Sequence, residues 1–211
     1  MIKIKFPDNS LKEYKKGITA IEIAEDISPS LAKNVLSVNF DGEIIEASTK
    51  IHTNGKIKFY TWQNKEGKMA FWHSSAHVLA QSILSIYPEA KLTIGPPIDN
   101  GFYYDVDFGN ISFSESDLIT LEKKFIEFAR QKFEFKIRNV KKEDALEFYK
   151  KENNSYKLEL IKDLNDGEIT FCDHSDFTDL CKGGHIPNTG FIKAVKLLNI
   201  AGAYWRGNEK N

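Results

Sequence analysis

Residues 73–83 read HSSAHVLAQSI, and this stretch separates two parts of the chain that differ in pattern. Before it, short segments alternate between apolar and polar residues. From it onward, apolar residues such as Ala80 and Ile83 recur at helical spacing. His73 and His77 lie four residues apart, so they share one face of the expected helix. The stretch therefore predicts a helix that begins near residue 73 and carries two imidazoles on one side.

Two interpretations of this histidine pair stay open. The imidazoles border the apolar stripe through Ala80 and Leu84, so they are either satisfied core residues or the lining of a half-buried cleft. The same spacing occurs in zinc metalloproteases. Those enzymes need a glutamate directly after the first histidine, where this chain has Ser74, which argues against that class.

Residues 1–62 are expected to form a ubiquitin-like β-grasp domain. Apolar and polar residues alternate over 2–6, which predicts a strand. Thr19 and Glu22 have the spacing of a capping box at a helix start. Further strands are predicted within 36–45 and 55–60, and strand–strand–helix–strand order is typical of the β-grasp fold.

Residues 63–211 are expected to form an α+β domain with an antiparallel sheet. The segment 61–72, TWQNKEGKMAFW, is interpreted as a linker. Asn100-Gly101 predicts a tight hairpin, and Ser114 with Asp117 predicts a helix start. The remaining patterns predict a strand at 133–140, a helix at 142–150 and strand-like segments at 156–161, 168–173 and 191–200.

Composition narrows the class of protein. The net charge is −1, so any nucleic-acid partner must be met by a local patch. Residues 123–142 carry eight Lys or Arg against two Glu, which fits either a phosphate-facing surface or an ordinary solvated face. No segment approaches the ~18 apolar residues of a membrane span. We therefore expect a cytoplasmic protein without a membrane partner, in which Cys172 and Cys181 are free thiols.

A second motif, DLCKGGHIPNTG at 179–190, places Cys181 four residues before His185. By itself it describes a glycine-rich turn with an incidental thiol. Together with His73 and His77 it provides three imidazoles and one thiolate, a set that a tetrahedral zinc ion accepts. The same groups without a metal could bind and activate a water molecule. Sequence spacing alone does not bring the two motifs together.

The ordered motifs resemble a known family. HxxxH followed by CxxxH is similar to the editing domain shared by threonyl- and alanyl-tRNA synthetases. The segments IGPPIDNGFYYDVDF, SYKLELI, DLCKGGHIPNTG and AGAYWRG resemble bacterial threonyl-tRNA synthetases in order, and residues 1–62 resemble their TGS domain. The resemblance implies that an aminoacylation core and an anticodon-binding domain follow Asn211, and that ATP, Mg and Zn belong to that core. No cofactor is expected for editing.

The resemblance implies hydrolysis of seryl-tRNA(Thr), with threonyl-tRNA(Thr) spared. Serine lacks one methyl group of threonine, and such a difference is worth only ~1–3 kcal/mol in a binding pocket. A second site that is too small for the threonine methyl group solves this problem. The partner would be the 3′-end of tRNA(Thr) carrying serine. A full-length family member is expected to be a homodimer, and a monomer is compatible with a fragment.

Carried over residue by residue, the family pattern gives each candidate a role. His73 and Lys157 are expected to position and activate water, and His77 and His185 to hold the terminal ribose and orient the water. Cys181 is expected to line the pocket and Asp179 to bind the free amine of the seryl group. The terminal adenosine is assigned to Tyr104, which would stack on the base, Asp105, which would accept from a ribose hydroxyl, and Gly95, which would allow close backbone approach.

The quartet of His73, His77, Cys181 and His185 is expected to hold no metal, although these residues would be the ligands if zinc bound. Two alternatives stay open. One is a zinc- or RNA-binding module without catalysis, in which the quartet is structural. The other is a free-standing deacylase of the alanyl type, against which the TGS-like N-terminal part argues.

Overall fold

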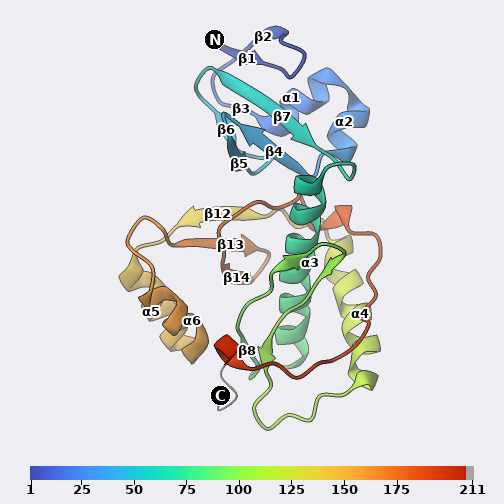
Figure 1. Cartoon of the computed structure of the whole chain (residues 1–211), viewed down its shortest axis with the longest axis vertical. Helices are drawn as coiled ribbons and strands as arrows, with labels where there is room; N and C mark the ends of the chain where they lie inside the picture. Colours follow the sequence, from blue (N-terminus) through green and yellow to red (C-terminus); the bar gives the residue numbers. More distant parts are fainter. Residues whose placement is uncertain (208–211) are drawn as a thin grey trace.

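The computed structural model describes residues 1–207 and contains two packed parts joined by the long helix α3, Lys65–Ile86 (Figure 1). The N-terminal part holds a five-stranded sheet in the order β2-β1-β7-β4-β5. Strands β1 and β7 are parallel, and the other neighbours are antiparallel. The bounds are β1 Ile2–Lys5, β2 Leu11–Tyr14, β4 Ser37–Phe40, β5 Glu43–Ile45 and β7 Gly55–Tyr60.

Helix α1, Ala20–Ile27, packs on this sheet and is followed by α2, Pro29–Asn34. The capping box is present, because Thr19 N donates to Glu22 Oε2 at 2.7 Å. Strands β3, Ile18–Thr19, and β6, Lys50–Ile51, form a separate pair. The core contains Ile2, Ile4, Ile23, Val38 and Ile57. Element order and sheet order are those of the expected β-grasp fold, which is confirmed.

Helix α3 begins eight residues earlier than expected, so most of the predicted linker at 61–72 is helical. Asn64 is the N-cap residue of α3, and its side chain ties the preceding turn together, since Thr61 N donates to Asn64 Oδ1 at 2.9 Å. Trp62, Phe71 and Trp72 pack edge to face around the start of the helix. Because these aromatic residues are ordered by packing on one another, the segment lacks the simple apolar stripe that marks a helix in sequence.

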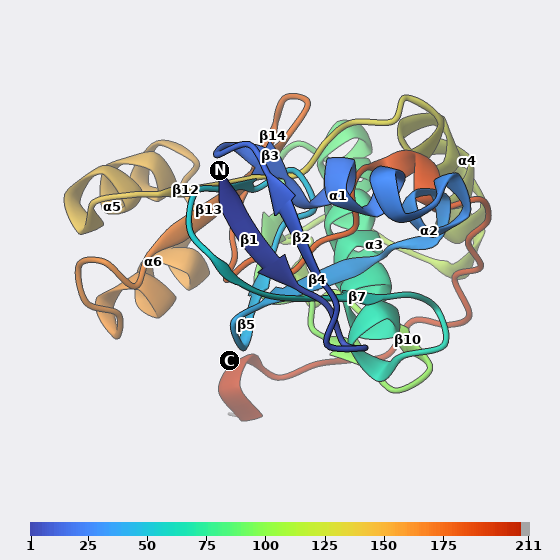
Figure 2. The same ribbon diagram turned by 90° about the horizontal axis from the view of Figure 1, so that it is seen from above.

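The second part is built around α3. Helix α4, Glu115–Arg130, and the pair α5, Lys142–Lys151, and α6, Ser155–Lys162, lie on opposite sides of α3 (Figure 1 and Figure 2). An antiparallel sheet has the order β12-β13-β14, with β12 at Lys136–Asn139, β13 at Thr170–His174 and β14 at Phe177–Leu180. The short pairs are β9, Pro97–Ile98, with β10, Gly101–Phe102, and β8, Lys91–Leu92, with β11, Val106–Asp107. The 3-10 turns are η1, Thr189–Phe191, and η2, Trp205–Gly207. The α+β expectation is confirmed.

Two of the strand-like segments are not strands. The segment 156–161 belongs to α6, whose N-cap Asn154 accepts from Lys157 N at 3.0 Å. The segment 191–200 pairs with no strand and crosses the surface, where Leu197 N donates to Glu122 Oε1 at 2.7 Å. Apolar residues recur along both segments at short spacing, which resembles the pattern of a strand.

Within residues 1–207, no helix is both long enough and apolar enough to cross a bilayer.

Candidate functional site

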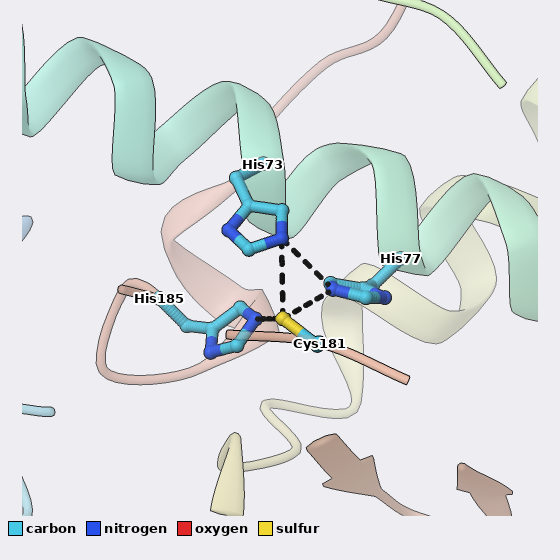
Figure 3. A group of neighbouring side chains, drawn as sticks. All are labelled: His73, His77, Cys181 and His185. Atoms are coloured by element: carbon cyan, nitrogen blue, oxygen red, sulfur yellow. Dashed lines mark hydrogen bonds between the residues drawn. The ribbon is translucent and has the colours of Figure 1, made fainter. Parts of the chain in front are cut away.

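The two short motifs converge on one cluster (Figure 3). His77 Nε2 lies 3.2 Å from His73 Nε2 and 3.3 Å from Cys181 Sγ. Cys181 Sγ also lies 3.3 Å from His73 Nε2 and 3.3 Å from His185 Nε2. His77, Cys181 and His185 are buried, whereas His73 is half-buried. His73 is therefore the member of the cluster that remains accessible from outside.

The backbone explains why these side chains meet. His73 and His77 occupy successive turns in the middle of α3. Cys181 follows the last residue of β14, and the chain then turns through Gly183 and Gly184 to reach His185. Ile186 N donates to the Ser74 hydroxyl on α3 at 3.0 Å, which ties this turn to the helix. Ser74, the residue that argued against a metalloprotease, thus has a positioning contact of its own.

A buried ion pair adjoins the cluster. Lys157 Nζ lies 2.6 Å from Asp179 Oδ1, and each side chain is at most 4 % exposed. Tyr104 donates its hydroxyl to Asp179 Oδ2 at 2.7 Å, and the Tyr149 hydroxyl lies 3.4 Å from Asp179 Oδ1. Burial raises the pKa of Asp179, but Lys157 and His77 outweigh it and hold that pKa well below its usual range. Asp179 is therefore a carboxylate at neutral pH.

Asp179 also connects this pair to the histidines. His77 Nδ1 lies 3.4 Å from Asp179 Oδ2, close enough for a charge interaction but poorly aligned for a hydrogen bond. The described residues give His77 Nδ1 no hydrogen-bond partner. Charged and polar groups thus form a continuous series from Lys157 through Asp179 to the cluster around Cys181.

Three residues assigned to the terminal adenosine lie near each other in sequence but differ in surroundings. The ring of Tyr104 packs against Gly95, where an added Cβ would lie 2.2 Å from Tyr104 Cδ2. Asp105 is half-buried, and burial raises the pKa of its carboxyl. Tyr103, by contrast, is 43 % exposed. Of the two adjacent tyrosines, Tyr104 faces Asp179 and Tyr103 faces solvent.

Electrostatics divides the cluster into charged and neutral members. Burial raises the pKa of the Cys181 thiol, but the surrounding imidazoles, His77 foremost, hold it well below its usual value. Burial opposes protonation of His77 and His185, yet Cys181 and the neighbouring carboxylates raise the pKa of both. Burial dominates for His73 and lowers its pKa. His73 is therefore a neutral imidazole at pH 7, whereas the pKa shifts of Cys181, His77 and His185 all favour the charged forms of these groups.

The structure adds three residues that sequence reasoning missed. Glu46, in the N-terminal domain, lies 3.1 Å from His185 Nδ1. Tyr149 is buried, and its hydroxyl donates to Asp179 Oδ1. His174 is 2 % exposed beside His77, with both ring nitrogens unpaired among the described residues. Glu46 gave no signal, because its contact joins residues 139 positions apart.

The donor set fits a zinc ion. The four ligating atoms lie within 4.8 Å of one another. Zinc bonds of ~2.0–2.3 Å in tetrahedral geometry separate the donors by roughly 3.3–3.8 Å, close to the distances around Cys181 Sγ. His73, His77, Cys181 and His185 would hold the ion, and it would act as a Lewis acid toward water or a carbonyl oxygen.

Family models and similar proteins were found for both parts of the chain. The family model for the TGS domain matches residues 2–61, and the model for the threonyl and alanyl tRNA synthetase second additional domain matches residues 169–211. The chain is 57% identical over 211 residues to a threonine–tRNA ligase of Flavobacterium psychrophilum. It is 56% identical to that of Flavobacterium johnsoniae and 51% identical to that of Cytophaga hutchinsonii, each over 211 residues.

These alignments cover 100% of this chain but only 32–33% of the three relatives. The chain thus spans about a third of the length of the curated relatives that it matches. With a TGS domain, a second additional domain and this identity along its whole length, the chain belongs to the threonyl-tRNA synthetase family and corresponds to the N-terminal region of its members.

Proposed function

We propose that this chain hydrolyses the ester of serine mischarged on tRNA(Thr) and spares threonyl-tRNA(Thr). One observation carries the proposal: a half-buried neutral imidazole stands next to buried charged groups in a domain that matches the tRNA synthetase second additional domain. Ester hydrolysis needs a positioned water, a proton acceptor and a group that stabilises the developing oxyanion. The cluster offers each of these.

His73 is the proposed general base. It is the accessible member of the cluster, and its lowered pKa keeps it unprotonated at pH 7. Its imidazole accepts a proton from water as the water oxygen attacks the ester carbonyl carbon. The bond between that carbon and the ribose oxygen then breaks, and the ribose oxygen takes up the proton. The products are free serine and tRNA with a free terminal hydroxyl.

Lys157 is proposed to help position the water and to stabilise the negative charge that develops on the carbonyl oxygen. For Asp179 we propose a role in holding Lys157 instead of binding the seryl amine. Its Oδ1 is already 2.6 Å from Lys157 Nζ and its Oδ2 accepts from Tyr104. A substrate ammonium would have to displace one of these partners, at a cost of breaking a buried pair.

The remaining candidates are proposed to shape the pocket. His77 and His185 orient the water and the terminal ribose, and Cys181 lines the wall as a thiolate, with no nucleophilic step assigned to it. Asp105 is proposed to accept from a ribose hydroxyl. The half-buried Tyr104 is proposed to stack on the adenine, and Gly95 to make room for the Tyr104 ring by its close approach.

Several finer assignments are also proposals. The domains are taken as residues 1–62 and 63–211, supported by the turn at 61–64 between β7 and α3. The complete protein is proposed to ligate threonine to tRNA(Thr), as its relatives are named threonine–tRNA ligases. We further propose that it uses ATP, Mg and Zn in an aminoacylation core, acts as a homodimer and works in the cytoplasm.

A direct assay tests the proposal. The chain is mixed at high concentration with tRNA(Thr) charged with serine or with threonine, and loss of each ester is followed. Faster loss of the seryl ester supports the proposal. Equal loss of both esters, or loss of neither above the rate in buffer, contradicts it.

A zinc-binding module without catalysis is the second candidate, favoured by three imidazoles and one thiol whose ligating atoms lie within 4.8 Å of one another. Carboxylates near the distal nitrogens of His77 and His185 add to this case, because metal-bound histidines commonly donate to such groups. Stoichiometric zinc in the purified chain, with unfolding when the zinc is removed, would support this candidate.

A further inference from the structure

A carboxylate of the N-terminal domain reaches into the cluster of the second domain. Glu46 follows β5, and its side chain is 12 % exposed against the fully buried His185. Glu46 Oε1 accepts from Gly184 N at 2.9 Å and lies 3.1 Å from His185 Nδ1. Glu46 Oε2 accepts from His185 N at 3.1 Å. Every side-chain hydrogen bond of Glu46 among the described residues therefore goes to Gly184 and His185.

The turn that receives Glu46 is shaped for it. Gly183 and Gly184 have φ of 88° and 86°, in the left-handed region that glycine adopts without strain. This conformation turns successive backbone N–H groups to one side, where they can bind an anion. A Cβ on Gly183 would lie 3.4 Å from Glu46 Oε1, and a Cβ on Gly184 would lie 3.6 Å from Ile44. Glu46 and Ile44 thus pack closely against the turn at Gly183 and Gly184.

The contact fixes the state of the His185 ring. A carboxylate has no hydrogen to donate, so Nδ1 must carry the hydrogen at this contact. Nε2 is then the atom that faces Cys181 Sγ at 3.3 Å. The ring is also stacked between His73, at a centroid distance of 4.7 Å, and Phe135, at 5.0 Å. Glu46 supplies the in-plane restraint that stacking alone cannot give.

We propose that Glu46 is a positioning residue through which the N-terminal domain keeps a hydrogen on His185 Nδ1 and orients the His185 ring in the deacylation site. The inference rests on the proposed function only where its test measures the rate of deacylation. It gives the N-terminal domain a role in the chemistry of a site that the second domain otherwise builds. Groups that orient metal-bound imidazoles in this way typically change activity by about 10–100-fold when removed, and we expect an effect of similar size here.

The test compares Glu46→Gln and Glu46→Ala in the full chain with a matched control, Glu43→Gln, on exposed β5 of the same domain. In Glu46→Gln, the side-chain oxygen can still accept from the backbone N–H groups of the turn. The side-chain NH2 group then faces His185 Nδ1, so the carboxylate contact with Nδ1 is lost. We expect kcat for seryl-tRNA(Thr) to fall about 10–100-fold in both Glu46 variants with KM nearly unchanged, and Glu43→Gln to match the parent.

A second measurement does not depend on activity. Nitrogen-15 NMR of the imidazole rings reports which ring nitrogen carries hydrogen. We expect the His185 Nδ1 signal to move in both Glu46 variants and to stay in place in Glu43→Gln. Melting temperatures of Glu46→Gln and Glu43→Gln are compared, so that a loss of kcat in a folded chain is separated from unfolding.

The outcomes are distinct. If the parent deacylates seryl-tRNA(Thr) but both Glu46 variants keep its kcat and its His185 signals, the inference on Glu46 is wrong and the proposed function stands. If the parent shows no deacylation, the proposed function fails, and the His185 signals still decide whether Glu46 sets the ring.

Discussion

Lys157 Nζ and Asp179 Oδ1 lie 2.6 Å apart, with side chains only 3% and 4% exposed. A buried pair of this kind contributes little net stability compared with an apolar pair of the same shape, because both charges lose their hydration. Removing one partner alone is costly, since the other charge stays buried. The pair is therefore best understood as a device that holds an ammonium group beside the cluster.

The first prediction concerns this pair. Lys157→Met should lower the free energy of unfolding by about 3–5 kcal/mol, because Asp179 would keep a buried charge without its cation. Adding Asp179→Asn should recover part of the loss. Urea unfolding measures both. Lys151→Met, which removes an exposed pair with Glu147, serves as the control and should leave stability nearly unchanged. A loss in the double variant equal to the sum of the two single losses would show that the charges do not interact.

The second prediction concerns His73. His73→Gln should slow deacylation of seryl-tRNA(Thr) by about 10²–10⁴-fold, because glutamine cannot take a proton from water. The melting temperature should stay close to that of the parent. The exposed His52 in the N-terminal domain provides the matched control, and His52→Gln should leave the rate unchanged. A parent-like rate in His73→Gln would remove His73 from the role of general base.

The third prediction concerns stability against pH. Burial lowers the pKa of His174 from 6.5 to about 3, so the folded chain keeps this ring neutral. Between these pH values the unfolded chain binds a proton that the folded chain does not. His174 therefore lowers the unfolding free energy by about 1.4 kcal/mol for each pH unit from 6.5 down to about 3, and this penalty is absent above pH 6.5.

Replacing His174 removes this dependence. In His174→Phe, the loss of unfolding free energy between pH 7.5 and pH 5.0 should be smaller than in the parent by about 2 kcal/mol. Urea unfolding at the two pH values measures this difference. Equal losses in the parent and the variant would mean that His174 takes up a proton in the folded chain.

The fourth prediction concerns Gly95. In Gly95→Ala the new methyl group would lie 2.2 Å from Tyr104 Cδ2, so the ring must move and weaken its 2.7 Å bond to Asp179. Overpacking of this kind costs about 1–3 kcal/mol, and we expect slower deacylation with it. Gly202 has no atom within 4 Å of an added Cβ, so Gly202→Ala is the control. Matching melting curves and rates for the two variants would contradict the prediction.

The fifth prediction concerns metal. Because the proposed mechanism uses only side chains and water, dialysis against a chelator should leave both the rate of deacylation and the melting temperature unchanged. Metal content is measured on the same sample. A rate that disappears with the chelator and returns with added zinc would instead support the zinc-binding role of the quartet.

Much of the fold could be predicted because its signals are local. The Thr19–Glu22 capping box and the alternation at 2–6 appear in the sequence, and both are present in the structure. The segment 156–161 misled, because apolar alternation outweighed the cap that Asn154 provides to α6. Tertiary packing decides such cases, as it does for the aromatic residues at the start of α3.

The candidate site divides in the same way. Residue types and spacing identified the quartet as a group with metal-binding or catalytic chemistry, but its convergence depends on folding. The burial of Lys157 could not be read from the sequence, because a lysine in a short amphipathic segment is usually exposed. The contact between Glu46 and His185 joins two domains, and no local pattern marks a residue for such a role.

Helix α3 starts at the junction between the two domains and runs without interruption through His73 and His77. One residue inserted ahead of His73 would rotate both imidazoles by about 100° around the helix axis relative to the N-terminal lobe. Hybrid proteins that exchange the N-terminal domain between relatives must therefore be joined before Lys65. A junction there leaves the helix, and with it the direction of both imidazoles, unchanged.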